Sequence, residues 1–215
     1  NGGLGRTPSG FLRVVFLDVG QGDATLVRFP DGRAVLVDAG GVPGATFDMG
    51  ERVVASALRA LGVRSLDTLV LTHGDPDHIG GAPAVLRDFS PHQIWEGVPV
   101  PPHMPLRELA STARLSGVAW RSVQVGDRES SGGVELRVLH PPPADWERQR
   151  VRNEDSVVIE LRLGAVSIVL PGDIGHEAEQ ILTPHLVTAP ITIVKAPHHG
   201  SATSSTEPSV AAAHP

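Results

Sequence analysis

The segment Leu71–Gly81, LTHGDPDHIGG, places two histidines and two aspartates between His73 and His78. Two carboxylates this close repel each other unless a positive group lies between them, and a bound metal cation is the simplest such group. Alternate residues of an extended chain point the same way, so we expect His73 and Asp75 to face one ion, while Asp77 and His78 turn toward a second. The alternative is a solvated acidic turn that caps the next helix.

Two later segments can add ligands to this set. Asp173, in LPGD, follows an apolar run, and its carboxylate could bridge two ions or cap the helix expected at 175–182. His198 and His199, in PHHGS, follow another apolar run and lie between a proline and a glycine. Three strand ends that carry His and Asp predict a layered α/β scaffold with one functional edge.

The elements that position these residues follow from the apolar periodicity. Strands are predicted at 11–18, 25–29, 34–41, 66–73, 92–97, 119–123, 134–140, 156–163, 165–173 and 191–197. Helices are predicted at 50–63, 79–89, 105–117 and 175–182. Asp31-Gly32 and Leu163-Gly164 are expected to form hairpin turns. Residues 1–10 are expected to be a flexible tail or linker, and residues 11–215 one folded domain.

Composition narrows the chemistry. The 215 residues contain no cysteine, so disulfides and thiolate metal sites are excluded, and any metal must be held by His, Asp, Glu or backbone oxygen. The net charge of −6 argues against binding nucleic acid through the whole surface. Bound divalent cations would supply local positive charge, as would Arg148, Arg150 and Arg152, although surface arginines without a role are as common. No apolar run is as long as a membrane span.

The motifs VDAGG, THGDPDHIGG, LPGD and PHHGS, in this order, resemble those of the metallo-β-lactamase fold superfamily of metal-dependent hydrolases. More narrowly, FLDVGQGDATLV, NEDS and PHHGS are similar to motifs of the C-terminal hydrolase domain of ComEC competence proteins, which are membrane channels for DNA uptake. The resemblance implies a four-layer αββα sandwich over residues 11–215 with a two-metal site at one edge. It also implies truncation at the C-terminal end, because relatives continue with a further strand.

The resemblance also implies roles for individual residues. The metal ligands would be His73 and Asp75 for the first ion, Asp77, His78 and His199 for the second, and Asp173 as the bridge. Asp38 would orient a ligand histidine. Asp77 and Asp173 would serve catalysis through the ions, and His198 would protonate the leaving oxygen. The reverse assignment of His198 and His199 stays open, and no substrate-binding residue is assigned.

Two positions depart from the common superfamily pattern. Asp75 and Asn153 stand where relatives usually have histidines, and we expect Asn153 to lie behind the ligands. His140, in VLHPPP, is an alternative donor. A ligand set rich in oxygen favours Mn²⁺, with Mg²⁺ or Zn²⁺ as the alternatives.

Two divalent ions suit displacement at phosphorus. The residues themselves therefore predict a two-metal hydrolase. The resemblance implies that it is a phosphodiesterase that acts on single-stranded DNA and degrades the strand that is not transported during DNA uptake. It would be a soluble extracytoplasmic domain of a larger bacterial membrane channel, with no membrane contact of its own. The alternatives are a two-metal phosphoesterase acting on small or cell-wall substrates, such as phosphocholine esters, and a non-catalytic module that binds DNA or a partner.

Overall fold

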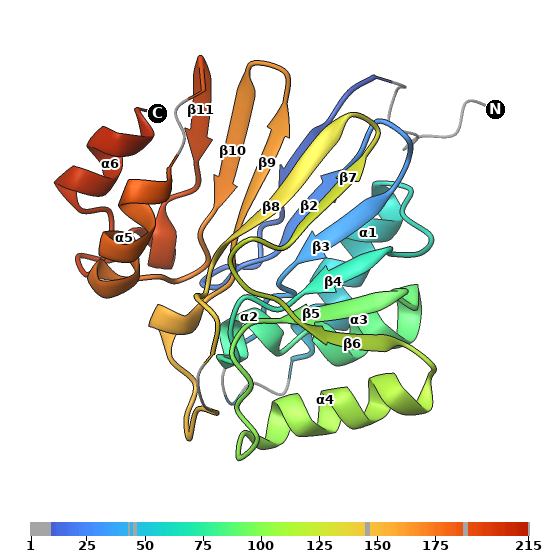
Figure 1. Ribbon diagram of the computed structural model, residues 1–215. Coiled ribbons are helices and arrows are strands. Elements are labelled where there is room, and N and C mark those ends of the chain that lie inside the picture. Colours follow the sequence, from blue (N-terminus) through green and yellow to red (C-terminus); the bar gives the residue numbers. More distant parts are fainter. Residues whose placement is uncertain (1–9, 43, 45–46, 145–146, 187–188, 215) are drawn as a thin grey trace.

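Two mixed β-sheets pack face to face, with helices on both outer sides (Figure 1). The computed structural model describes residues 10–42, 44, 47–144, 147–186 and 189–214. Of the tail expected at 1–10, only Gly10 belongs to the described residues.

The first sheet has the strand order β1-β2-β3-β4-β5-β6. Its strands are β1 (Arg13–Phe16), β2 (Thr25–Arg28), β3 (Ala34–Val37), β4 (Thr68–Val70), β5 (Gln93–Glu96) and β6 (Ala119–Ser122). Strands β1, β2 and β3 are antiparallel, with the predicted hairpin turn at Asp31-Gly32, and β3 to β6 run parallel. The carboxyl ends of β3 and β4 therefore lie at the same edge of the sheet.

The second sheet has the order β11-β10-β9-β8-β7. Its strands are β7 (Arg128–Ser131), β8 (Val134–His140), β9 (Val158–Leu163), β10 (Val166–Leu170) and β11 (Ile191–Val194). Strands β7 to β10 are antiparallel neighbours, and β11 pairs parallel to β10. The segments that follow β10 and β11 therefore also leave from one edge.

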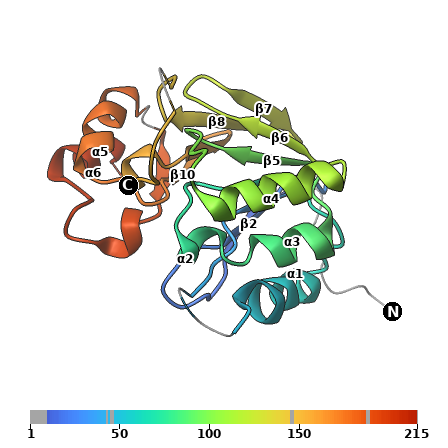
Figure 2. The ribbon, with the colours of Figure 1, turned by 90° about the horizontal axis from the view of Figure 1, so that it is seen from below.

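The core lies in three layers. Between the sheets, Phe29 and Trp95 of the first sheet pack with Leu136 and Ile159 of the second, and all four are buried. The outer face of the first sheet is covered by α1 (Ala55–Ala60), α3 (Ala82–Phe89) and α4 (Met104–Leu115). The outer face of the second sheet is covered by α5 (His176–Leu182), which contacts α6 (Glu207–Ala213) (Figure 2). This is the predicted αββα sandwich.

Two local predictions were wrong in detail, and one strand was missed. The helix expected at 50–63 opens as a π-helix over Gly50–Val54 before α1. The helix expected at 79–89 is divided into α2 (Pro76–Ile79) and α3, because Gly80-Gly81 lies against other backbone: a Cβ at Gly81 would come within 2.1 Å of the Ala39 carbonyl oxygen. Strand β7 was not predicted, since its sequence RESS has no apolar alternation.

Candidate metal centre

The loop after β4 carries the first predicted ligands. Asp75 precedes α2, and its carbonyl oxygen accepts hydrogen bonds from the backbone N–H groups of His78 and Ile79, each at 3.0 Å. Pro76 occupies the first position of α2, where its fixed φ suits a helix start. This single turn reverses the chain, so that the buried His78 ring comes within 4.2 Å of the His73 ring, measured between centroids.

His78 is held between two carboxylates. Its Nδ1 lies 2.8 Å from Oδ2 of Asp38, and its Nε2 lies 3.2 Å from Oδ2 of Asp173. Burial alone would lower the pKa of His78, but Asp38 and Asp173 outweigh it and raise the pKa to about 11. Burial likewise opposes ionisation of Asp173, and the adjacent His78 ring overcomes it, which lowers the pKa of Asp173 to about 2. Without a metal, a proton on His78 supplies the positive charge that these carboxylates need.

Asp38 is fixed from behind as well. It follows β3, and its two carboxylate oxygens accept the backbone N–H of Thr72 at 2.8 Å and the hydroxyl of Thr72 at 2.7 Å. Its φ of 58° is left-handed, a conformation that Asp tolerates better than most residues. Asp38 therefore lies behind Nδ1 of His78 while Nε2 of the same ring faces Asp173, an arrangement compatible with the orienting role that the resemblance implies for Asp38.

His198 and His199 point in different directions from one turn. Both have left-handed backbone angles, with φ of 49° and 52°. Nε2 of His199 lies 3.3 Å from Oδ2 of Asp173 and 3.5 Å from Oδ2 of Asp77. Nε2 of His198 lies farther from Asp173, at 4.0 Å, and is 3.3 Å from the side-chain amide nitrogen of Asn153. His199 is thus the histidine that points at the carboxylates.

The site contains buried polar atoms that lack hydrogen-bond partners. Among the described residues these include Nε2 of His73, Nε2 of His78 and Oδ1 of Asp173. Such atoms cost free energy when buried, and here they converge, since His73, His78 and Asp173 offer ligand atoms within 4.8 Å of one another. A divalent cation would satisfy all three, so the donor set fits a metal ion.

Further groups of potential ligands overlap with this one. They are Asp77 with His78 and His199, Asp23 with Asp173 and His199, and Asp23 with Asp38 and His78. Asp173 belongs both to the group with His73 and His78 and to the group with Asp23 and His199, so it lies between His73 on one side of the site and His199 on the other. The donors come from the segments after β1, β3, β4, β10 and β11, so one edge of the sandwich assembles them.

Asp75 and His140 do not join any of these groups in the part of the chain that the structure describes. Oδ2 of Asp75 lies 3.3 Å from Nε2 of His73, with its side chain 41% exposed, so the carboxylate is next to the site and accessible. His140 is buried, and its Nδ1 lies 2.9 Å from the carbonyl oxygen of Ser156. Burial lowers the pKa of His140, so the ring is neutral.

Sequence reasoning missed Asp23 and Lys195. Oδ2 of Asp23 accepts a 2.6 Å hydrogen bond from Lys195 Nζ, and Oδ1 lies 3.8 Å from Nδ1 of His199. The sequence feature that could have indicated Asp23 is its position after Gly22 in VGQGDA, shortly after an apolar strand. Gly22 allows the close approach: a Cβ there would come within 2.5 Å of the Asp77 carbonyl oxygen.

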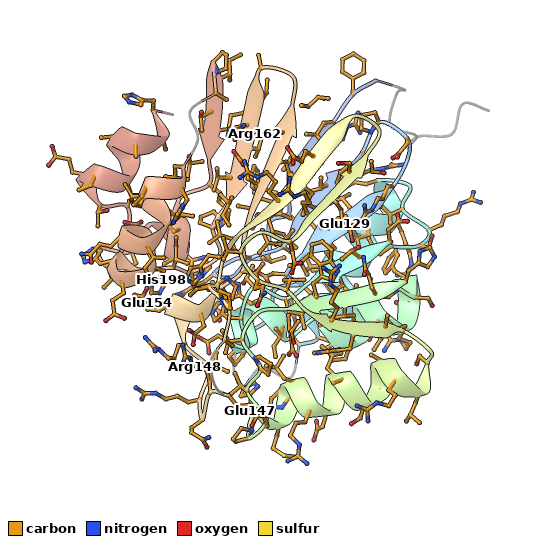
Figure 3. All side chains as sticks on the ribbon, viewed as in Figure 1. Glu129, Glu147, Arg148, Glu154, Arg162 and His198 are labelled. Carbon is orange, nitrogen blue, oxygen red and sulfur yellow. The ribbon has the colours of Figure 1, made fainter. Side chains whose placement is uncertain are left out.

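The loop after β8 brings positive charge to the same end of the molecule. Arg148 donates to both carboxylate oxygens of Asp155, at 2.9 and 3.1 Å, and Arg152 pairs with the exposed Glu177 at 3.2 Å. Figure 3 shows Arg148 on the loop next to the turn that carries Glu154, at the end of the molecule where His198 lies. The short helical turn Asn153–Asp155 therefore links this loop to His198 through Asn153.

A comparison with protein-family models matches residues 17–214 to the metallo-beta-lactamase superfamily. The chain belongs to this superfamily. Its members are generally metal-dependent hydrolases, and the fold typically binds two divalent metal ions. The His and Asp clusters described above lie at strand ends, and their ligand atoms are close enough to hold a metal ion.

Curated relatives of this metallo-beta-lactamase domain include competence proteins. ComE operon protein 3 of Bacillus subtilis is 32% identical over 207 residues, which are 90% of this chain and 26% of that protein. Competence protein ComA of Neisseria gonorrhoeae is 30% identical, over 92% of this chain and 25% of its own length. The chain thus spans about a quarter of these relatives.

Among solved structures, a HARLDQ-motif mutant of a metallo-beta-lactamase from Cronobacter sakazakii has a TM-score of 0.51 at 15% identity, covering 84% of this chain and 76% of that one. This likeness concerns the fold alone. Among the described residues, no helix has both the length and the apolar character that crossing a membrane requires.

Proposed function

We propose that this domain is a Mn²⁺-dependent phosphodiesterase that cleaves single-stranded DNA. The observation that carries the proposal is the convergence of His73, His78 and Asp173, whose buried Nε2 and Oδ1 atoms have no hydrogen-bond partner. Buried ligand atoms aimed at one point are costly without an ion and favourable with one.

The donors divide into two half-sites. His73 and Asp75, 3.3 Å apart, would hold one ion. Asp77, His78 and His199 would hold the other, and Asp173 would bridge. Carboxylates are at least as numerous as imidazoles in this set, and hard oxygen ligands favour Mn²⁺ over Zn²⁺.

When bound, two such ions would activate a water molecule and neutralise phosphate oxygens. The residues of the chain supply the rest of the chemistry. His198 faces the site without pointing into the carboxylate cluster, so it is available to protonate the leaving oxygen. Asn153 contacts its Nε2 at 3.3 Å and Thr203 contacts its Nδ1 at 3.2 Å, which holds the ring in place.

Two observations favour DNA as the substrate. One of the relatives reported above is named as a competence protein, and Arg148 is held by Asp155 on the loop beside the site, where it could follow a phosphate backbone. A guanidinium already oriented by a carboxylate loses little conformational entropy when it binds phosphate. We infer that the domain is the extracytoplasmic part of a membrane DNA-uptake protein and degrades the strand that is not transported.

The test is cleavage of a labelled oligonucleotide, single-stranded or double-stranded, with Mn²⁺, Mg²⁺ or Zn²⁺. We expect cleavage of single strands, fastest with Mn²⁺, and its loss in Asp77→Ala. Asp88→Asn, which alters an Arg-paired aspartate outside the groups of potential ligands, is the matched control. DNA binding without cleavage in every metal would favour the non-catalytic module. Cleavage of a phosphocholine ester but not DNA would favour the small-substrate phosphoesterase.

A further inference from the structure

Asp23 lies at the edge of the site with a geometry that parallels that of Asp38. We propose that Asp23 is a positioning residue for His199, as Asp38 is for His78. The inference rests on the proposed function, in that it takes His199 as a metal ligand. It assigns a task to a carboxylate that the sequence motifs left without one.

The two pairs share one arrangement of ring nitrogens. In His78, Nε2 faces Asp173 at 3.2 Å, and Nδ1 faces Asp38 on the opposite side of the ring at 2.8 Å. In His199, Nε2 faces Asp173 at 3.3 Å, and Nδ1 faces Oδ1 of Asp23 at 3.8 Å. A carboxylate behind Nδ1 keeps the proton on that nitrogen and leaves Nε2 free to bind a metal.

The backbone holds Asp23 in register with the metal-ligand loop. Its N–H donates to the carbonyl oxygen of Asp77 at 3.2 Å, and its own carbonyl oxygen accepts from Gly40 at 2.7 Å. The residue is 8% exposed. Asp23 is therefore fixed relative to Asp77, whose carboxylate also faces the His199 ring.

Lys195 determines how strongly Asp23 acts on His199. Nζ of Lys195 donates to Oδ2 of Asp23 at 2.6 Å, so the second oxygen, Oδ1, is the one directed toward His199. Lys195 precedes His199 by four residues on the segment that follows β11, so the same short segment positions the ammonium group and the ring. The 3.8 Å separation from Nδ1 is longer than a hydrogen bond. Because Asp23 is shared with Lys195, its hold on His199 is weaker than that of Asp38 on His78.

A double-mutant cycle on the full chain tests this role. Mn²⁺ affinity is measured by electron paramagnetic resonance for the wild type, Asp23→Asn, His199→Ala and the double variant, with Asp88→Asn as the control. We expect Asp23→Asn to weaken Mn²⁺ binding by about 10-fold, the lower end of the usual loss for a partner behind a ligand, because the hold of Asp23 on its ring is weaker than that of Asp38. In the His199→Ala background it should cause no further loss. An undiminished effect in that background would mean that Asp23 does not act through His199, and would overturn the proposal.

A second variant separates positioning from a structural ion pair. Lys195→Met breaks the same pair but leaves the Asp23 carboxylate free to approach His199. We expect its Mn²⁺ affinity to equal or exceed that of the wild type, even if its melting temperature in EDTA falls. A loss of affinity as large as that of Asp23→Asn would show that the pair matters only for structure. A wild-type chain that binds no Mn²⁺ would contradict the proposed function itself, whereas wild-type affinity in Asp23→Asn would contradict only this inference.

Discussion

Replacing Asp38 with Asn should disable the metal centre while preserving the fold. In the structure, Oδ1 of Asp38 accepts a hydrogen bond from the backbone N–H of Thr72. Its Oδ2 accepts hydrogen bonds from the Thr72 hydroxyl and from Nδ1 of His78. Asn can keep the first of these bonds and tolerates the left-handed φ of 58°. Its NH₂ group, however, replaces the Oδ2 acceptor and donates toward His78. The His78 proton must then reside on Nε2, the nitrogen that a metal would need.

The expected loss of Mn²⁺ affinity is about 10–100-fold, as for other partners behind a ligand. Asp38→Ala should behave differently, because it also leaves the two donors of Thr72 buried without an acceptor. Each unpaired donor costs about 1–3 kcal/mol, so the free energy of unfolding should fall by about 2–6 kcal/mol. Asp38→Asn thus tests the orientation of His78 alone, whereas Asp38→Ala also tests how far Asp38 stabilises the ends of β3 and β4.

The assay is calorimetric titration of Mn²⁺ into metal-free protein, with urea unfolding in EDTA as the measure of stability. Asp88→Asn is again the control, because it removes an Arg-paired carboxylate outside the groups of potential ligands. If Asp38→Asn folds normally and binds Mn²⁺ as tightly as the wild type, the argument from the ring proton of His78 is refuted.

Three further predictions concern the same centre. Asp77→Ala should abolish hydrolysis with little change in melting temperature, since the side chain is 24% exposed on the short helix α2 and not packed in the core; cleavage at the parent rate would contradict the two-metal assignment. His199→Ala should regain activity as Mn²⁺ is raised, whereas His198→Ala should stay about 10²–10⁴-fold slow at saturating metal; the reverse pattern, from rates against Mn²⁺ concentration, would exchange their roles. Burial opposes a proton on His78, but the flanking carboxylates raise its pKa from 6.5 to about 11, so the metal-free protein should lose stability as the pH rises from about 7 toward 11; constant urea stability in EDTA across that range would contradict this.

Much of the fold could be predicted because its signals are local. The hairpin at Asp31-Gly32 and the parallel strands that end near His73 follow from turn chemistry and apolar runs. The errors arose where tertiary packing outweighs local pattern. The division between α2 and α3 at Gly80-Gly81 depends on backbone from residues 39–41 and Gly50 lying against these glycines. Strand β7 pairs only with β8 in the described sheet, and its sequence has no apolar alternation from which a strand could be predicted.

The candidate site divides in the same way. The segment His73–His78 can be recognised from the sequence because its candidate ligands are close together along the chain. Asp173 and the His198-His199 pair can be recognised because they follow apolar strands. The link between Asp23 and Lys195 spans 172 positions, so no spacing rule could join them. Similarly, the sequence allowed His140 as a donor, but only the structure shows its ring bonded to the Ser156 carbonyl oxygen.

The sandwich explains why ligands so far apart in sequence can form one centre. Strands β3 and β4 run parallel in one sheet, and β10 and β11 run parallel in the other, so each pair delivers the segments that follow it to one edge. Residues from both sheets meet at the His78 ring: Asp38 of the first sheet lies on one side of it, and Asp173 of the second lies on the other. A shift of one sheet against the other would move Asp173 away from His78 and His73 together. Metal binding should therefore stabilise the packing of the two sheets, because the bridging carboxylate and the histidines belong to different sheets.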